Sequence, residues 1–339
     1  MAALGRLRLR AWSARRLYEG LLLTNTGGLD IEQPREPRDV RRFSHEAMAT
    51  VFEVHAVHPD ERYAAQAAQA AFDLVDRLER ELSRFLPNSD IARLNHLAAG
   101  ERARIGLSAM ECLVIARHVF DLTGGAFDVS IGTGLPSLEL DPDDCVVRAT
   151  QSSVRLDLGG IGKGYAVDLM AELLEEWGLE RALVHGGFSS VLALEAPEGL
   201  GGWPLTLSDP GNPSRVLVDR SVRQTAFGAS GMRKGDHIVE PRTGQPARGC
   251  RAAWIAVPRP AAARHEARSG GRPRVAAAAV ADALTTAFML MSLEAIDALC
   301  TQTPGVEAWV LPEVADGRAG EAALLHVGAS GPGYTSTSL

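Results

Sequence analysis

Residues 154–178 read VRLDLGGIGKGYAVDLMAELLEEWG and join three local patterns. Val154–Leu158 alternates apolar and charged residues and predicts a strand. Gly159–Gly164 predicts a tight turn, and Tyr165–Trp177 predicts a helix that ends at the next glycine. Backbone amides ahead of a helix favour anions, and Lys163 adds a point charge suited to phosphate. An ordinary strand-to-helix turn explains the same motif equally well.

Strands and helices alternate along the rest of the chain. Val51–Val57 alternates as a half-buried strand does, and residues 61–82 carry apolar side chains at helical spacing. Further elements are expected as a short helix capped by Ser89, helices over 108–123 and 275–293, and strands over 182–185, 191–195, 204–208 and 308–311. This order predicts an α/β (α+β) fold, a single catalytic domain with mixed sheets and flanking helices.

The chain divides into one central domain and two weaker ends. Residues 1–40 are first basic and then rich in turn formers, which predicts a weakly structured N-terminal segment. The catalytic domain is expected over 41–327, and the Pro-, Arg- and Gly-rich stretch 258–273 is expected to be an exposed insertion loop. The Gly-, Ser- and Thr-rich end, 328–339, predicts a disordered tail.

The composition limits the function classes. Of 339 residues, 46% are hydrophobic and 23% charged, and the net charge of -7 argues against a general nucleic-acid binder. The four cysteines are scattered without a CxxC pair, so they indicate no cysteine zinc site or redox motif and fit a reducing compartment. The basic N-terminus lacks the long apolar stretch of a secretory signal, so we expect a cytoplasmic location.

Asp282 and Thr286 lie four residues apart in an otherwise apolar helix, so their oxygens share one helix face. A buried carboxylate is costly unless it is paired or binds a metal, and carboxylate and hydroxyl oxygens suit a hard ion such as magnesium. The pair indicates a magnesium site, with an arginine partner or a loop cap as the alternative role of Asp282. A charge also makes a membrane span a poor interpretation of 275–293.

Two further segments hold candidate polar groups. His237 precedes the turn Pro241–Gly244 and could act as a general base, although an isolated histidine is more often structural. Asp128 is a candidate ligand contact or a simple turn cap. Ser230 with Asp209 raises the alternative of a Ser-His-Asp hydrolase, but the sequence GASG around Ser230 lacks the nucleophile-elbow pattern.

Several segments, in this order, resemble the ApbE-type FAD:protein FMN transferases. The matching pieces are Leu82–Phe85 with Ser89–Asn95, Thr123–Asp128, Leu156–Asp168, His185–Gly187, Ser230–Gly231, His237–Ile238 with Pro241–Gly244, and Ala281–Ala287. The resemblance covers roughly residues 43–312 and implies the T-fold-like architecture of that family.

The resemblance implies a magnesium-dependent reaction with FAD as the substrate. A Ser or Thr hydroxyl of an acceptor protein would attack the FMN phosphorus and AMP would leave, with His237 and Asp282 as catalytic residues. The implied metal ligands are the Asp282 carboxylate, the Thr286 hydroxyl and the Gly160 carbonyl. The implied FAD-contact positions are Met48, Phe85, Ala126, Phe127, Asp128, Asp157, Lys163 and His237.

Other functions fit the same residues. In a magnesium-dependent FAD pyrophosphatase, water would replace the acceptor hydroxyl. The short segment 230–237 implies a reduced lid, which motivates a non-catalytic flavin-binding protein as the third alternative. Ala49 also stands where relatives often have glycine. The implied partner is a redox protein with a Ser/Thr flavinylation motif; this chain shows no such motif, so modification would occur in trans. The sequence leaves the oligomeric state open.

Overall fold

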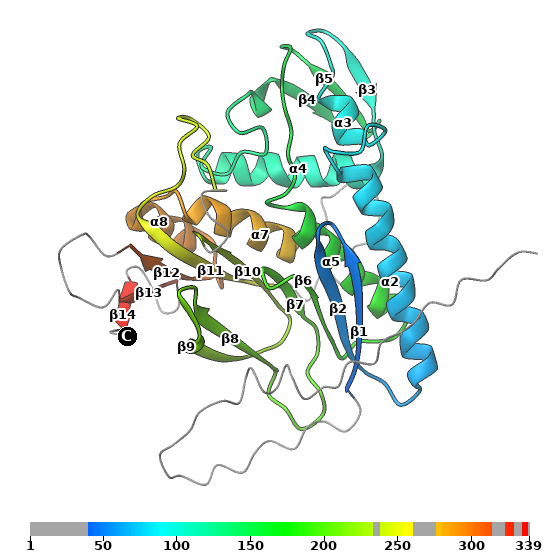
Figure 1. Ribbon diagram of the computed structural model, residues 1–339, viewed down its shortest axis with the longest axis vertical. Helices are drawn as coiled ribbons and strands as arrows, with labels where there is room; N and C mark the ends of the chain where they lie inside the picture. The colour runs from blue at the N-terminus through cyan, green and yellow to red at the C-terminus, as the bar shows by residue number, and fades with distance from the viewer. Residues whose placement is uncertain (1–39, 233–237, 260–275, 314–322, 329–333, 338–339) are drawn as a thin grey trace, which may run out of the picture.

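The computed structural model describes residues 40–232, 238–259, 276–313, 323–328 and 334–337 (Figure 1). All but the last residue of the predicted weakly structured segment 1–40, and nearly all of the predicted insertion 258–273, lie outside these ranges. In the predicted disordered tail, however, Tyr334–Thr337 forms a strand that pairs with the strand before it. The unsatisfied backbone edge of that preceding strand offers hydrogen bonds that composition alone does not reveal.

A nine-stranded sheet forms the centre of the molecule (Figure 1). Its strands, in spatial order, are β1 (Val40–Ala47), β2 (Thr50–Val57), β6 (Ala182–Gly186), β7 (Ser190–Ala193), β10 (Thr225–Gly231), β11 (Cys250–Pro258), β12 (Glu307–Pro312), β13 (Leu324–Val327) and β14 (Tyr334–Thr337). Each neighbouring pair is antiparallel, where we predicted mixed sheets. Many sheet neighbours follow one another directly in the chain, which favours antiparallel pairing.

Helices cover one face of this sheet, so the α/β (α+β) class with flanking helices is confirmed (Figure 1). The covering helices are α2 (Glu61–Leu82), α5 (Gly162–Glu176) and α7 (Ala277–Phe288). The predicted limits of α2 are confirmed, because Asp60 caps its first turn and its buried side chains follow the helical spacing. The Ala-rich composition of α7 lets it pack closely against α5 and β10.

A smaller layer lies beyond these helices, at the top of Figure 1. It contains α3 (Asp90–Leu94), α4 (Leu107–Leu122), the 3-10 helix Leu135–Ser137, and the sheet β3-β5-β4 made of Arg102–Arg104, Val146–Ala149 and Leu138–Asp141. α8 (Leu293–Gln302) follows α7 and contacts β12 and β13. The predicted helices after Ser89 and over 108–123 are thereby confirmed within one or two residues.

The second face of the large sheet packs on a hairpin of β8 (Trp203–Asp209) and β9 (Asn212–Val222). A separate apolar core fills this interface, with Trp203, Phe227, Trp254 and Trp309 among its buried members. The sheet is therefore covered on both faces, as its mostly apolar strands require.

The predicted strand Val154–Leu158 is wrong, because this segment pairs with no strand. Its backbone groups bond elsewhere: Leu156 N–H donates to Asn95 Oδ1 at 2.6 Å and Leu156 O accepts from Asn95 Nδ2 at 3.0 Å. Asp157 N–H donates to Val129 O at 2.7 Å. The segment is extended, but a side chain and a loop take the place of a neighbouring strand.

The predicted exposure of Arg259 is wrong. This residue was expected in an exposed insertion, but it is buried directly after β11 and paired with Glu175.

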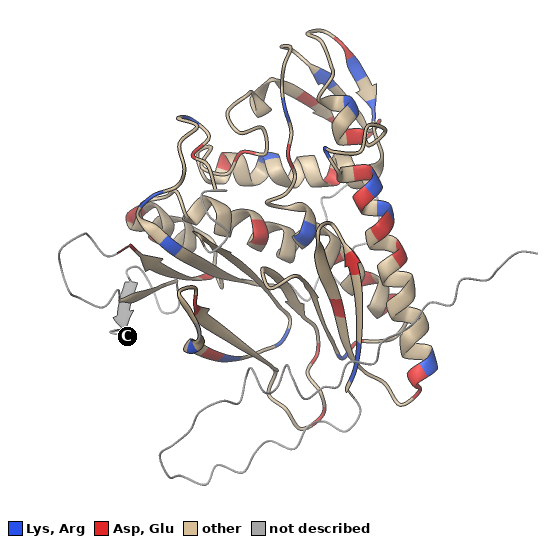
Figure 2. Ribbon diagram, viewed as in Figure 1, with Lys and Arg blue, Asp and Glu red and all other residues tan. Residues whose placement is uncertain are grey.

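No helix in the described part of the chain is long and apolar enough to cross a membrane. All four cysteines are free, and three are buried. Over the described surface, acidic and basic residues are interspersed along α2 and the small sheet (Figure 2).

Candidate functional site

Two glycines bring α7 unusually close to its neighbours. A Cβ at Gly164 would stand 2.2 Å from the Ala278 carbonyl oxygen, and one at Gly228 would stand 2.3 Å from the Ala281 carbonyl oxygen. Any side chain at either position would collide with backbone. The absence of a Cβ at both positions therefore lets α5 and β10 clamp α7 from two sides, which fixes the first half of α7 in place.

Asp282 points from this clamped helix toward the start of α5. Its side chain is buried, and its Oδ2 accepts hydrogen bonds from Gly164 N–H at 3.1 Å and Lys163 Nζ at 3.3 Å. These donors compensate a carboxylate that would otherwise be costly to bury. The sequence left an arginine partner open as an alternative, and the observed partner is a lysine.

Thr286 and Gly160 lie beside Asp282. Thr286 Oγ1 donates to Asp282 O at 3.4 Å, and a Cβ at Gly160 would stand 3.4 Å from Thr286 Oγ1 and 3.3 Å from the Phe127 ring. The structure thus places Thr286 next to Gly160, with Asp282 one turn earlier on α7. A buried carboxylate, a hydroxyl and a backbone carbonyl are the oxygen donors that a hard divalent cation prefers.

Thr285, the residue before Thr286, contacts β10. Its hydroxyl donates to Asp282 O at 2.9 Å and accepts from Ser230 Oγ at 3.1 Å, so it ties α7 to β10. This contact gives Ser230 a structural partner.

Lys163 and Asp157 organise the glycine turn. Lys163 Nζ also donates to Gly159 O at 3.1 Å, while Asp157 accepts from Gly159 N–H at 2.9 Å and pairs with Arg84 at 3.1 Å. Next to Arg84, the ring of Phe85 is 78% exposed with the guanidinium 4.5 Å from its centroid. Phe85 therefore offers an aromatic face to a ligand near this turn.

The predicted contact residues Ala126, Phe127 and Asp128 follow α4. The Phe127 ring is buried against Gly160, and Ala126 is partly buried against the core. Asp128 accepts from Ser130 N–H and Oγ, both at 2.7 Å, and from Gly132 N–H at 2.9 Å. Asp128 therefore shapes the loop that follows it, as the turn-cap alternative expected.

Met48 lies farther along the sheet, in the β1–β2 turn. Met48 and Ala49 have φ values of 48° and 57°, the pair of left-handed residues that a tight hairpin requires. Ala49 thus adopts a conformation that glycine would take at lower cost. Within the part of the chain that the structure describes, no hydrogen bond joins Met48 or Ala49 to Asp282, Thr286 or Gly160.

His237 lies outside the described residues, but the loop that follows it is placed. A Cβ at Gly132 would stand 2.1 Å from the Pro241 carbonyl oxygen, and Arg242 Nη2 donates to Gly124 O at 2.6 Å. Ile238 is buried and accepts from Ala247 N–H at 2.8 Å. The loop after His237 therefore packs on the loop that carries Ala126 to Asp128.

Sequence reasoning missed Asp168, which holds the N-terminus of α7. Its buried carboxylate accepts from Ala278 N–H at 3.0 Å and Ala279 N–H at 2.8 Å. Burial raises the pKa of Asp168 to about 7, although the two backbone donors lower it. A charged residue among apolar neighbours, on the same helix as Lys163, was the available signal. A second missed group, Glu53, His55 and His185, lies on β2 and β6.

Comparison with known proteins places this geometry in context. A family model described as the ApbE family matches residues 48–135 and 132–269. The FAD:protein FMN transferase of Treponema pallidum (strain Nichols) is 26% identical over 299 residues, which cover 73% of this chain and 77% of the relative. One from Klebsiella pneumoniae (strain 342) is 23% identical over 216 residues, 53% of this chain and 66% of that protein.

Solved structures share the fold. The apo flavinyl transferase ApbE of Pseudomonas stutzeri superposes with a TM-score of 0.68 at 21% identity, covering 88% of this chain and 94% of that one. The flavin transferase ApbE of Vibrio cholerae gives a TM-score of 0.67 at 18% identity, covering 88% of this chain and 97% of that one.

Proposed function

The chain belongs to the ApbE family, and on that premise we propose that it transfers FMN from FAD to a Ser or Thr hydroxyl of an acceptor protein and releases AMP. The observation that carries this proposal is the group of Asp282, Thr286 and Gly160 beside the glycine turn and Lys163. It joins oxygen donors for a hard cation to a cationic side chain and a helix N-terminus, both of which attract phosphate.

Asp282, Thr286 and the Gly160 carbonyl would hold Mg²⁺. Bound there, the ion would supply Lewis-acid neutralisation of the charge on the phosphoanhydride. Lys163 would add a second positive charge, since its ammonium already lies between Asp282 and Gly159. The two clamping glycines keep α7, and with it these oxygens, at a fixed place relative to α5. Such positioning is the main contribution of a protein to phosphoryl-type transfer.

The proposed transfer forms one bond to phosphorus and breaks one. The acceptor oxygen forms a bond to the FMN phosphorus, and the bond from that phosphorus to the bridging oxygen breaks. AMP leaves with the electron pair. The hydroxyl proton passes to His237, the role that the family resemblance implies for this residue.

Contacts to FAD would come from the turn and the loops around it. Phe85 would stack on a ring of the ligand, because most of its surface is exposed. Phe127 would shape the floor beside Gly160, and Asp128 would hold the loop that carries Phe127. Asp157 would order the turn through Gly159. Met48 lies in the β1–β2 turn, so any contact of Met48 with FAD would be made from that turn.

The partner would be a redox protein that presents a flavinylation motif, with no nucleic acid involved, and we propose a cytoplasmic reaction. The test incubates FAD, Mg²⁺ and a candidate acceptor peptide, and measures AMP and flavin-labelled peptide. Labelled peptide with equimolar AMP supports transfer. Free FMN and AMP formed equally without peptide would identify a pyrophosphatase instead, and FAD binding without AMP release a binding protein.

The variant Asp282→Asn tests the metal site in that assay. It keeps the volume of the side chain and removes the charge that would bind the ion, so labelling should fall by about a hundredfold or more. Asp73→Asn changes an exposed carboxylate on α2 and should leave labelling unchanged. Full labelling by Asp282→Asn would refute the assigned metal site.

A further inference from the structure

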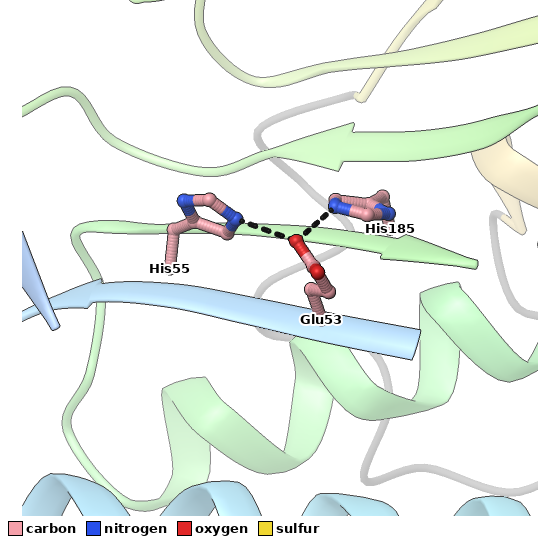
Figure 3. Close-up of side chains that lie close together, drawn as sticks. All are labelled: Glu53, His55 and His185. Atoms are coloured by element: carbon pink, nitrogen blue, oxygen red, sulfur yellow. Dashed lines mark hydrogen bonds and ion pairs between the residues drawn. The ribbon is translucent and has the colours of Figure 1, made fainter. Parts of the chain in front are cut away.

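Three side chains of types that can bind a metal ion meet on one face of the large sheet, on β2 and β6 (Figure 3). Glu53 and His55 are two residues apart on β2, so their side chains leave the same face of the strand. His185 is the register partner of Glu53 on the neighbouring strand β6. The antiparallel pairing therefore brings together residues 132 positions apart in the chain.

Both histidines direct a ring nitrogen at the same carboxylate oxygen (Figure 3). His185 Nε2 lies 2.9 Å and His55 Nε2 3.2 Å from Glu53 Oε2. One ligand atom from each of the three residues falls within 4.8 Å of the others. Nitrogen and oxygen ligands of a tetrahedral zinc ion lie about 2.0–2.2 Å from the metal, so neighbouring ligand atoms are about 3.3–3.6 Å apart. Small side-chain adjustments would meet that requirement.

The second nitrogen of His185 fixes the orientation of the first. His185 Nδ1 lies 2.8 Å from Gly187 O, which can only accept a hydrogen bond. Nδ1 therefore carries a proton. The 2.9 Å contact between His185 Nε2 and Glu53 Oε2 then requires either a second ring proton or a metal ion between the two atoms. A histidine whose other nitrogen donates to a backbone carbonyl is also the usual arrangement of a metal ligand.

Arg42 limits which ion can bind. It donates to both Glu53 oxygens, with Nε 3.0 Å from Oε2 and Nη2 on Oε1. Its positive charge opposes a second cation, so an ion held mainly by carboxylate charge would gain little here. An ion that bonds strongly to imidazole nitrogen is favoured over Mg²⁺ or Ca²⁺. This selectivity separates the cluster from the oxygen donors around Asp282.

We propose that Glu53, His55 and His185 form a binding site for a divalent transition-metal ion, with Zn²⁺ as the best fit. The three protein ligands leave a fourth position for water or another ligand. The ion would join β2 to β6 and, through the hydrogen bond of His185 to Gly187, would hold the turn between β6 and β7. This proposal does not depend on the proposed transfer activity.

The test uses the tag-free full chain, stripped of metal and dialysed into buffer with millimolar Mg²⁺. Titration with Co²⁺ should give visible absorption bands that saturate at one equivalent, and Zn²⁺ should remove them. His185→Gln and His55→Gln should each weaken binding of Co²⁺ and Zn²⁺ about tenfold or more. His326→Gln is the matched control. His326 Nε2 also lies 2.9 Å from a glutamate oxygen, Glu307 Oε2, but no second histidine contacts that carboxylate within the described residues.

The wild-type titration is the first test of the proposal. No saturable Co²⁺ signal at one equivalent would overturn it, and the cluster would then be held by protons alone. Binding that survives unchanged in both His185→Gln and His55→Gln would also overturn it, because the ion would lie elsewhere. Circular dichroism and thermal unfolding in the absence of metal establish that the variants are folded.

Discussion

Gly164 lies so close to α7 that a Cβ there would stand 2.2 Å from the carbonyl oxygen of Ala278. The N–H of the same glycine donates to Asp282 at 3.1 Å. One residue therefore sets the distance between α5 and α7 and also holds the carboxylate that we assign to the metal. The close approach gives the glycine turn a packing role in addition to any role in phosphate binding.

Replacement of Gly164 by alanine should force α5 and α7 apart. We expect the free energy of unfolding to fall by about 1–3 kcal/mol from overpacking, and the Mg²⁺ concentration for half-maximal activity to rise. Gly162→Ala is the matched control, because a Cβ there would meet Leu158 Cβ at an ordinary 3.9 Å. Chemical denaturation and a Mg²⁺ titration measure both quantities. Equal behaviour of the two variants would contradict the assigned role of Gly164.

Adjacent threonines on α7 should separate metal binding from packing. Thr286→Val removes a hydroxyl beside Gly160, and we expect about tenfold more Mg²⁺ to be needed for half-maximal activity, roughly 1.4 kcal/mol. Thr285→Val removes the partner of Ser230 and should lower stability by about 1–2 kcal/mol with little change in the Mg²⁺ requirement. If Thr285→Val raised the Mg²⁺ requirement more than Thr286→Val, the metal ligands would have to be reassigned.

The sequence predicted well those elements whose side-chain pattern is decided locally. The apolar positions of 61–82, from Ala64 to Leu82, are the ones that α2 buries, because helical periodicity directly reports the buried face. Asp282 and Thr286 could be paired because they are one helical turn apart. Their nearness to Gly160 was implied by the family resemblance, and the structure places Gly160 next to Thr286.

The failures share one physical cause, which is that sequence does not say what a segment pairs with. Val154–Leu158 has a strand pattern, yet the Asn95 side chain takes its backbone hydrogen bonds. The group of Glu53, His55 and His185 depends on the register of two strands far apart in the chain. Arg259 lies in a stretch whose composition suggests exposure, but its side chain is buried and pairs with Glu175, which belongs to α5.

Asp168 should make stability depend on pH. Its pKa is raised from 3.8 to about 7 in the folded chain, so the folded state binds this proton more tightly than the unfolded state does. The stabilisation is fully present below about pH 4 and is lost as pH rises through 7, by at most about 1.4 kcal/mol per pH unit. We expect the stability of the wild type relative to Asp168→Asn to fall between pH 5 and pH 8 in urea denaturation. A constant difference over that range would show that Asp168 has an ordinary pKa.

Breaking the ion pair of Arg259 and Glu175 should lower the free energy of unfolding more than breaking the exposed pair of Arg148 and Glu139. Arg259 Nη1 and Nη2 donate to the two oxygens of Glu175 at 2.6 and 2.8 Å, and Arg259 N–H donates to Gln224 O at 2.8 Å. The guanidinium is buried, so its removal leaves Glu175 with an uncompensated charge in a partly buried place. Arg259→Met should therefore lower the free energy of unfolding by about 3 kcal/mol.

Arg148→Met is the comparison for that variant, since it breaks a pair with Glu139 in which both side chains are more than half exposed. We expect this change to cost under about 1 kcal/mol, because water screens the exposed pair. The double variant Arg259→Met with Glu175→Leu should regain much of the lost stability, because it replaces the charge left behind by an apolar contact. A double variant no more stable than Arg259→Met would mean that the cost lies in lost packing at the end of β11 and not in the unpaired carboxylate.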